Sequence, residues 1–495
     1  MTVVADKKER NMIFTIIGEK PGHPKKETFL YDNETNTLSH SEGTIYEFPK
    51  NDNDNIISHK LVVPFSKDEP LKKSKDIRIL KIQLGLSCNY SCDYCSQRFV
   101  ERAPETNKKD IDDFMAKLEN LNIKDEGGTK IEFWGGEPFV YWKTLKPLVA
   151  AMNEKYVNYK NKPQFSVITN GSLLNDEICD WLFDNNFSVA ISHDGPGQFV
   201  RGPDPIEDPK IKDTWLKFYR RMKRANRNVS FNSMLNVHNV SRKVVQDWFI
   251  DFTGDFSIVL GEGGMIDAYD ADGQKNALQT KADHFKFRQT AFSDIVENKA
   301  ELGFNIVPMK LNGFREALLS HKPASSLGQK CGMDNEDIVA IDLRGDVITC
   351  QNVSTVEISN NMEPHKGGNV INMEEVEIRT ATHWRNRPHC SECPVVHLCQ
   401  GACMFLEGEN WDTSCANSYS DNIAFFAAVF LDITGFTPVF IENEHLPDVR
   451  RDIFGTTIPH TEKVKKGFPI KVVVEAKYDV IDEVKVYKKA EVISS

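Results

Sequence analysis

Residues 78–95 read RILKIQLGLSCNYSCDYC, and this stretch decides the fold class of the chain. It begins with an apolar run typical of a buried strand and ends in three closely spaced cysteines. Strand-like and helix-like patterns alternate after it, which predicts a parallel α/β sheet covered by helices, either doubly wound or curled into a barrel. The expected strands lie at 78–84, 130–134, 164–169, 188–193, 229–236 and 255–260.

Length and charge exclude several classes of protein. The chain has 495 residues, more than one compact core holds at roughly 150 residues per domain. Sixty-one Lys and Arg against 72 Asp and Glu give a net charge of −11, which argues against broad binding to nucleic acid or an anionic membrane. No apolar run approaches the roughly 20 residues that span a bilayer, and residues 1–20 lack the features of a signal peptide. We therefore expect a cytoplasmic protein whose 11 cysteines are reduced.

Clustered thiols in a reducing compartment indicate metal binding or catalysis. Cys88, Cys92 and Cys95 form C-x3-C-x2-C in the loop after the first expected strand, at the end of the sheet where active-site loops gather. Three thiolates on one loop can hold three irons of a [4Fe–4S] cluster and leave the fourth iron open. The alternative, a structural zinc site, needs a fourth ligand, and the next histidine along the chain is His193.

This cysteine motif, with Tyr94 before its last cysteine, resembles the signature of the radical S-adenosylmethionine (SAM) enzymes. In that family SAM chelates the open iron, and its reductive cleavage gives a 5′-deoxyadenosyl radical that abstracts a hydrogen atom from the substrate. The resemblance implies a partial (β/α)6 barrel, in agreement with the six expected strands. It also implies catalytic roles for Cys88, Cys92 and Cys95, and an external electron donor such as a flavodoxin or ferredoxin.

Two further motifs resemble SAM-binding elements of the same family. Trp134-Gly135-Gly136-Glu137-Pro138 is similar to the GGEP element, in which glycines let the backbone approach a ligand and a carboxylate pairs with the SAM ammonium. Ser192-His193-Asp194-Gly195-Pro196 is similar to an S-x-D-G-P element whose short polar side chains reach the ribose.

Three other residues follow from the resemblance. Thr169-Asn170-Gly171 is similar to the TNG turn, and Asn236 ends the fifth expected strand, where an ordinary strand-terminal Asn is the alternative. Arg201 stands where relatives place an Arg on the SAM carboxylate, although RGPDPIED departs from their pattern and an exposed loop Arg is the alternative. The implied cofactor-binding residues are Gly135, Gly136, Glu137, Pro138, Asn170, Ser192, Asp194, Asn236 and Arg201.

The C-terminal cysteines resemble the SPASM domain, which holds two auxiliary [4Fe–4S] clusters in radical SAM enzymes that modify peptides and proteins. By that pattern Cys331, Cys350 and Cys403 hold the first auxiliary cluster. Together with the N-terminal cluster, the two auxiliary clusters make three clusters in all. A hairpin with Arg344-Gly345-Asp346 at its turn is expected to carry Cys350. Two zinc ribbons are the alternative. The second auxiliary cluster is implied for Cys390, Cys393, Cys399 and Cys415.

The first auxiliary cluster lacks a fourth cysteine, because the run after Cys331 is GMDNED. Either Asp334, Glu336 or Asp337 supplies an oxygen ligand, or the iron is open to water or to the substrate. The remaining cysteine, Cys179, lies on an apolar helical face and is expected to be a core thiol.

The resemblance covers about residues 78–425. Residues 1–77 are expected to form a strand-rich domain that braces the barrel or pairs with an extended peptide, with 66–76 as a linker. The barrel is expected over 78–315, the SPASM domain over 316–432, and a β tail over 433–495.

Three functions remain open at this stage. The first is a maturase that modifies a ribosomally made precursor peptide by crosslinking, oxidation, epimerisation or excision. The second is an anaerobic sulfatase-type maturase that forms formylglycine; such enzymes have an Asp base where this chain has Gln351, and an amide cannot accept the proton. The third is a non-catalytic iron–sulfur or zinc protein, which has no need of the SAM-binding motifs.

Overall fold

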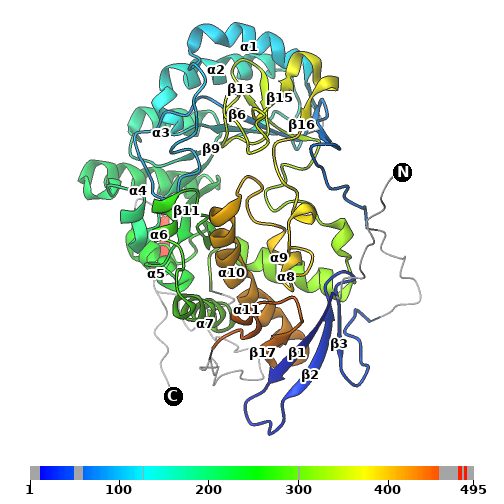
Figure 1. Cartoon of the computed structure of the whole chain (residues 1–495). Helices are drawn as coiled ribbons and strands as arrows, with labels where there is room; N and C mark the ends of the chain where they lie inside the picture. The colour runs from blue at the N-terminus through cyan, green and yellow to red at the C-terminus, as the bar shows by residue number, and fades with distance from the viewer. Residues whose placement is uncertain are drawn as a thin grey trace, which may run out of the picture.

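A mixed sheet of nine strands organises the protein, in the order β12-β11-β10-β9-β8-β6-β13-β14-β15. The computed structural model describes residues 12–49, 59–125, 127–298 and 301–455, and the backbone of 478–481 and 484–487. Helices cover the outer face of the sheet, and a second sheet of four strands lies at the far end of the molecule (Figure 1). Within these ranges no helix is long and apolar enough to cross a membrane.

Six parallel strands form the curved, barrel-like part of the sheet, as the sequence predicts. The sixth strand differs in position, because residues 255–259 form a turn closed by Asp255 and Ser257, and the strand itself begins at Leu260. Its sequence, LGEGGM, lacks the β-branched residues that mark a strand, so the prediction of 255–260 was wrong. The six strands are β6 (Ile79–Gln83), β8 (Lys130–Trp134), β9 (Gln164–Thr169), β10 (Ser188–Ser192), β11 (Val229–Leu235) and β12 (Leu260–Met265).

Apolar side chains on one face of these strands pack against the helices. Phe133, Val189 and Phe231 are buried there, and Trp215 fills the space beside Gly171, whose carbonyl accepts its indole N–H at 3.0 Å. This core fixes the loops at the strand ends. The helices are α1 (Ile111–Lys117), α2 (Trp142–Lys155), α3 (Asp176–Asp184), α4 (Pro209–Arg224) and α5 (Arg242–Thr253).

The cysteine-rich region extends this sheet. β13 (Ile338–Asp342) pairs in parallel with β6, and it forms the expected hairpin with β14 (Asp346–Ile348). Gly345 in the turn has φ +76°, a left-handed conformation that glycine adopts without strain. β15 (Lys366–Asn369) completes the sheet, so the barrel strands and the region around Cys350 share one continuous hydrogen-bonded structure.

A long central helix joins the barrel to the cysteine-rich region. This helix, α10 (Gly408–Thr434), packs against α7 (Lys281–Asn298) and α8 (Ile306–Leu319). Its buried Asp421 accepts hydrogen bonds from Arg242 of α5 and, at 3.0 Å, from Lys310 of α8. Burial alone would raise the pKa of Asp421, but Arg242 and Lys310 hold it below its usual range. This ion cluster ties three helices together.

The two ends of the chain meet in the second sheet. Its strands are β1 (Ile13–Glu19), β2 (Glu27–Asp32), β3 (Thr37–His40) and β17 (Thr437–Glu442), in the order β17-β1-β2-β3. Phe29 and Tyr31 point from β2 onto Phe430 and Phe426 of α10, with ring centroids 4.9 and 5.2 Å apart. The bracing expected of the N-terminal strands is therefore directed at α10 and the cysteine-rich region.

Short strand pairs replace the expected linker. β4 (Leu71–Lys72) pairs with β16 (Glu377–Ile378), and β5 (Asp76–Ile77) pairs with β7 (Asn122–Ile123). Part of the expected linker at 66–76 is therefore hydrogen-bonded to the rest of the protein. The tail contains the antiparallel pair β18 (Tyr478–Ile481) and β19 (Val484–Tyr487); the rest of the expected β tail after 455 lies outside the described residues.

The ion cluster on α10 gives a stability prediction. Asp421→Asn should lower the free energy of unfolding by about 3–5 kcal/mol, because two buried cations lose their anion. Asp432→Asn is the matched control on the same helix, since its ion pair with Arg315 (3.2 Å) is about half exposed and is worth less than about 1 kcal/mol. Chemical denaturation at pH 7 measures both, and equal losses would contradict the assignment.

The same cluster predicts a pH dependence. Because the pKa of Asp421 is lower in the folded state, its contribution is complete above the unfolded pKa of about 3.9 and is lost as the pH falls further. Denaturation of the parent between pH 7 and pH 3 should therefore show a steeper acid loss than that of Asp421→Asn. Parallel curves would show that Asp421 does not carry this dependence.

Candidate active site and cysteine clusters

The three N-terminal cysteines lie on the loop after β6. Burial is the main cause of the raised pKa values of Cys88 and Cys92, and the neighbouring thiols add to it. Backbone N–H groups of Tyr90 and Gln97 donate to Cys88 Sγ (3.3 Å) and Cys95 Sγ (3.4 Å). Thiols with backbone donors on one loop fit an iron–sulfur cluster. Within the described residues, no three His, Cys, Asp or Glu side chains lie close enough to hold a single metal ion.

Gly135 and Gly136 receive the backbone of the cysteine loop. A Cβ atom at Gly136 would lie 2.4 Å from the carbonyl oxygen of Ser87 and 2.6 Å from that of Leu86. The Gly136 N–H donates to the Gly85 carbonyl at 3.1 Å, and the Glu137 N–H donates to the Ser87 carbonyl at 3.0 Å. From the sequence, we expected these glycines to let the backbone approach a ligand. In the structure, the backbone that they approach closely is that of the cysteine loop.

Glu137 links the loops after β8 and β9. Its fully buried carboxylate accepts the N–H of Phe139 (3.1 Å) and the hydroxyl of Thr169 (2.8 Å) on one oxygen, and the N–H of Asn170 (2.8 Å) on the other. Burial raises its pKa, and these three donors oppose the rise. Pro138 begins the short 3-10 helix Pro138–Tyr141 that Glu137 caps. The Asn170 side of the carboxylate can accept one more donor, such as an ammonium.

Asn170, Ser192 and Asn236 lie at successive strand ends. Asn170 donates to Asn89 Oδ1 at 2.9 Å and lies 4.0 Å from Cys88 Sγ, so the structure brings it to the cysteine loop. Ser192 ends β10 and is buried. Asn236 is fully buried; its Oδ1 accepts the N–H of His238 at 2.9 Å, whereas its Nδ2 has no hydrogen-bond partner among the described residues.

A buried network joins the cysteine loop to the loop after β10. The Tyr94 hydroxyl donates to Asp194 Oδ2 at 2.5 Å and accepts Nη1 of Arg201 at 2.7 Å. Asp194, which is fully buried, also accepts the N–H of Met234 at 2.9 Å. Both Asp194 oxygens thus have partners within the protein. The sequence motif indicated only that residue 94 is aromatic. The contacts of the Tyr94 hydroxyl could not be predicted from the motif spacing, and the only hint of them is that the aromatic residue is a tyrosine.

Arg201 carries positive charge into this site. Burial opposes that charge, but Tyr94 and Asp194 raise its pKa well above the usual value. Its Nε is buried and has no hydrogen-bond partner in the described part of the chain. The sequence left open an exposed loop Arg, and the structure places Arg201 inside the network instead. A half-satisfied guanidinium beside three cysteines fits an anionic group such as a carboxylate.

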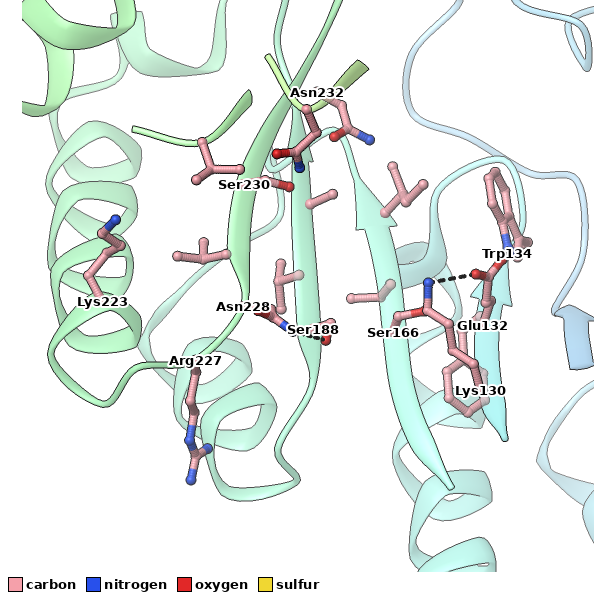
Figure 2. A pocket seen from close by; sticks show the side chains of 18 of the residues that line it. Lys130, Glu132, Trp134, Ser166, Ser188, Lys223, Arg227, Asn228, Ser230 and Asn232 are labelled. Atoms are coloured by element: carbon pink, nitrogen blue, oxygen red, sulfur yellow. Dashed lines mark hydrogen bonds and ion pairs between the residues drawn. The ribbon is translucent and has the colours of Figure 1, made fainter. Parts of the chain in front are cut away.

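A polar cavity of ≈ 620 Å³ lies on the inner face of the barrel strands. Figure 2 shows Ser166, Ser188 and Ser230 of three neighbouring strands lining it, with the ion pair Lys130–Glu132 (2.8 Å) at one side. Closed barrels fill these layers with bulky branched side chains. Small hydroxyl side chains leave the lumen hollow here.

The seven C-terminal cysteines fall into two groups. Burial raises the pKa of Cys350, and Cys331 and Cys403 add to the rise; burial also raises the pKa of Cys390, with Cys399, Cys415 and Cys393 adding to it. The assignment of these two sets to two clusters, which the resemblance implies, stays a prediction. The second group comprises Cys390, Cys393, Cys399 at the end of α9 (Val396–Cys399), and Cys415 on α10.

A left-handed turn separates the two groups. Gln400, Gly401 and Ala402 have φ values of 48°, 79° and 49°, between Cys399 of one group and Cys403 of the other. The Ala402 N–H donates to the Cys399 carbonyl at 3.4 Å, and although burial raises the pKa of the Cys399 thiol, the backbone donors of Gly401 and Ala402 oppose the rise. Successive N–H groups of this kind form a concave anion site, which fits a negatively charged cluster.

The acidic residues after Cys331 differ in their contacts. Asp337 forms a paired hydrogen bond with Arg78 (2.9 and 3.1 Å), and Glu336 is exposed. Asp334 accepts the N–H of Gln329 at 2.8 Å through one oxygen, while the other is buried without a hydrogen-bond partner among the described residues. Asp334 is thus the acidic residue best suited to a fourth ligand.

Comparisons with known proteins agree with this geometry. Residues 82–248 match the family described as the Radical SAM superfamily. The radical SAM cyclopropyl synthase TigE of Paramaledivibacter caminithermalis is 27% identical over 34% of this chain, which spans 37% of that protein. The serine-type anaerobic sulfatase-maturating enzyme of Bacteroides thetaiotaomicron is 22% identical over 67% of this chain and 83% of its own length.

A solved structure shares the fold. "Native anSMEcpe with bound AdoMet and Cp18Cys peptide" superposes with a TM-score of 0.51 at 20% identity, over 72% of this chain and 98% of the other. This structure confirms the α/β fold, and the radical SAM domain rests on the family match of residues 82–248.

The Tyr94 network predicts a loss of ligand affinity. Tyr94→Phe should weaken SAM binding by roughly tenfold, because Asp194 and Arg201 each lose a buried partner worth about 1–3 kcal/mol. Tyr90→Phe is the matched control: its hydroxyl donates to the Pro203 carbonyl (2.7 Å) at the surface, and its loss should change affinity less than about threefold. Anaerobic equilibrium binding measures both, and equal affinities for the parent and Tyr94→Phe would show that the network does not shape the site.

Proposed function

We propose that this chain, a radical SAM protein related to the anaerobic sulfatase-maturating enzymes, modifies a residue of a ribosomally made precursor peptide. The observation that carries this proposal is the meeting of the cysteine loop and the Tyr94–Asp194–Arg201 network at the carboxyl ends of strands whose inner face lines a polar cavity. A [4Fe–4S] cluster and SAM bound there would supply the 5′-deoxyadenosyl radical that abstracts a hydrogen atom.

Different residues of this chain would bind the cluster and SAM. Cys88, Cys92 and Cys95 would hold the cluster, with their sulfurs oriented by the backbone donors of the loop. Arg201 would bind the SAM carboxylate through its free Nε–H, and Glu137 would accept the SAM ammonium beside Asn170. Asn170, Ser192, Asp194 and Asn236 would surround the rest of the ligand, with Gly135, Gly136 and Pro138 shaping the loop.

The C-terminal region suits two auxiliary clusters of the SPASM type, three clusters in all. The first would use Cys331, Cys350 and Cys403, and the second the other four cysteines. A flavodoxin or ferredoxin would deliver electrons from outside. The domain limits of 78–315 and 316–432 follow from this division, with the ends joined in the second sheet.

A peptide substrate suits the lumen. Its hydroxyl and amide side chains, such as Ser166, Ser230 and Asn232, can form hydrogen bonds with a polar peptide segment. Because these side chains are neutral, they do not require the segment to carry a particular charge. The relative of known structure contains AdoMet and a peptide, and TigE is named a cyclopropyl synthase. These likenesses support peptide modification as the reaction class.

The sulfatase-type alternative has the longer alignment in its favour. Its acidic base is absent at Gln351, whose side-chain oxygen faces the Cys350 thiol at 3.3 Å and whose carbonyl accepts Gln83 at 2.7 Å. We expect no aldehyde when the reduced enzyme and SAM are incubated with a Cys- or Ser-containing sulfatase peptide. Formylglycine detected by mass spectrometry would favour the alternative.

Removal of the N-terminal cluster ligands tests the proposal. Replacing Cys88, Cys92 and Cys95 by Ala should leave about eight of twelve irons and abolish SAM binding to the reduced protein. Cys179→Ala is the matched control, because this buried thiol lies on α3 in the hydrophobic core and should change neither quantity. Iron analysis and anaerobic SAM binding report the result. Full iron retention by the triple variant would contradict the cluster assignment.

A further inference from the structure

We propose that Arg450 raises the reduction potential of the second auxiliary cluster by donating a charged hydrogen bond to Cys415. This inference rests on the proposed function, in which Cys415 is a cluster ligand. Arg450 belongs to the short helix α11 (Asp448–Arg451), which follows the cysteine motif and β17 in the chain.

The contact is direct and doubly supported. Nη2 of Arg450 lies 3.2 Å from Cys415 Sγ. Its guanidinium also stacks over the ring of Tyr419, 4.8 Å from the centroid, one helical turn along α10 from Cys415. The Tyr419 hydroxyl donates back to the Arg450 carbonyl at 2.6 Å. Side chain and backbone of Arg450 are thus both fixed on α10.

Two residues of α7, the buried Arg288 and the partly buried Gln289, hold the segment that carries Arg450. Nη1 of Arg288 donates to the carbonyls of Val449 (3.1 Å) and Asp452 (3.0 Å), on either side of Arg450. Gln289 donates to the Phe454 carbonyl at 2.6 Å. Three carbonyls of this short segment are therefore held by hydrogen bonds. Because the backbone around Arg450 is already ordered, placing its guanidinium on the Cys415 sulfur costs little further conformational entropy.

The first auxiliary group has different partners. The Cys350 thiol faces the neutral amide of Gln351 at 3.3 Å. The nearby Lys73 ammonium donates to three backbone carbonyls, of Met333, Asn335 and Ile338, at 2.6–2.8 Å. A cationic donor on the sulfur thus distinguishes Cys415 from Cys350.

A cation on a cluster sulfur acts on the reduced state. Reduction adds negative charge to the cluster. A hydrogen bond from a cationic Arg N–H to a cluster sulfur therefore stabilises the reduced cluster more than the oxidised cluster. Hydrogen bonds to sulfur and net charge are established determinants of cluster potential. Arg450 therefore favours electron transfer to the cluster held by Cys415.

The test is a redox titration of the iron-loaded full chain, followed by electron paramagnetic resonance, with Cys88, Cys92 and Cys95 replaced by Ala so that only auxiliary clusters remain. In this background Arg450→Met should move one auxiliary cluster to a more negative potential with unchanged iron content. Arg450→Gln should give a smaller shift, because it keeps a neutral donor, and Arg450→Lys should restore most of the parent value. Arg451→Met is the matched control, since Arg451 donates to the Leu446 carbonyl at 2.8 Å, and it should match the parent.

An unchanged potential in Arg450→Met with full iron would overturn the inference. If that variant loses iron, the comparison of Arg450→Gln with Arg450→Lys decides it, and equal potentials in those two overturn it. A parent background that binds no iron would overturn the cluster assignment in the proposed function, a failure visible before any Arg450 variant is compared.

Discussion

Backbone atoms of two loops meet so closely at Gly136 that no side chain fits between them. The carbonyl oxygens of Leu86 and Ser87 occupy the space of a Cβ, so the cysteine loop is seated on the loop after β8. Glu137 then ties that loop to Asn170 after β9, and Tyr94 ties the cysteine loop to Asp194 after β10. Each strand end is thus positioned relative to the three thiols by short-range contacts.

The remaining structure supports this arrangement from two sides. The hairpin of β13 and β14 continues the barrel sheet beyond β6, which links the region around Cys350 to the strand that precedes Cys88. On the other side, α10 carries Cys415 and contacts α5, α8 and the terminal sheet. The three groups of cysteines are therefore held by one continuous framework.

Much of this could be predicted from the sequence. The strands before Gly135 and Asn170 are apolar and periodic, so the fold followed from local patterns, whereas the grouping of the thiols came from the family resemblance and stays a prediction. The sixth strand could not be located, because Gly261, Gly263 and Gly264 hide the strand pattern. Pairing of β1 with β17 joins residues more than 400 apart, and no local pattern carries such information.

Side-chain partners were the least predictable part of the site. The motif spacing brings Glu137 and Asp194 to the right loops, but it does not show that their oxygens already have protein partners. Arg450 lies outside every motif, and its role depends on a chain segment that folds back onto α10.

Reductive cleavage of SAM is the central claim. Iron-replete parent protein, reduced anaerobically and incubated with SAM, should form 5′-deoxyadenosine and methionine, detected by liquid chromatography and mass spectrometry. Intact SAM after incubation with protein that holds its iron and is fully reduced would contradict the account.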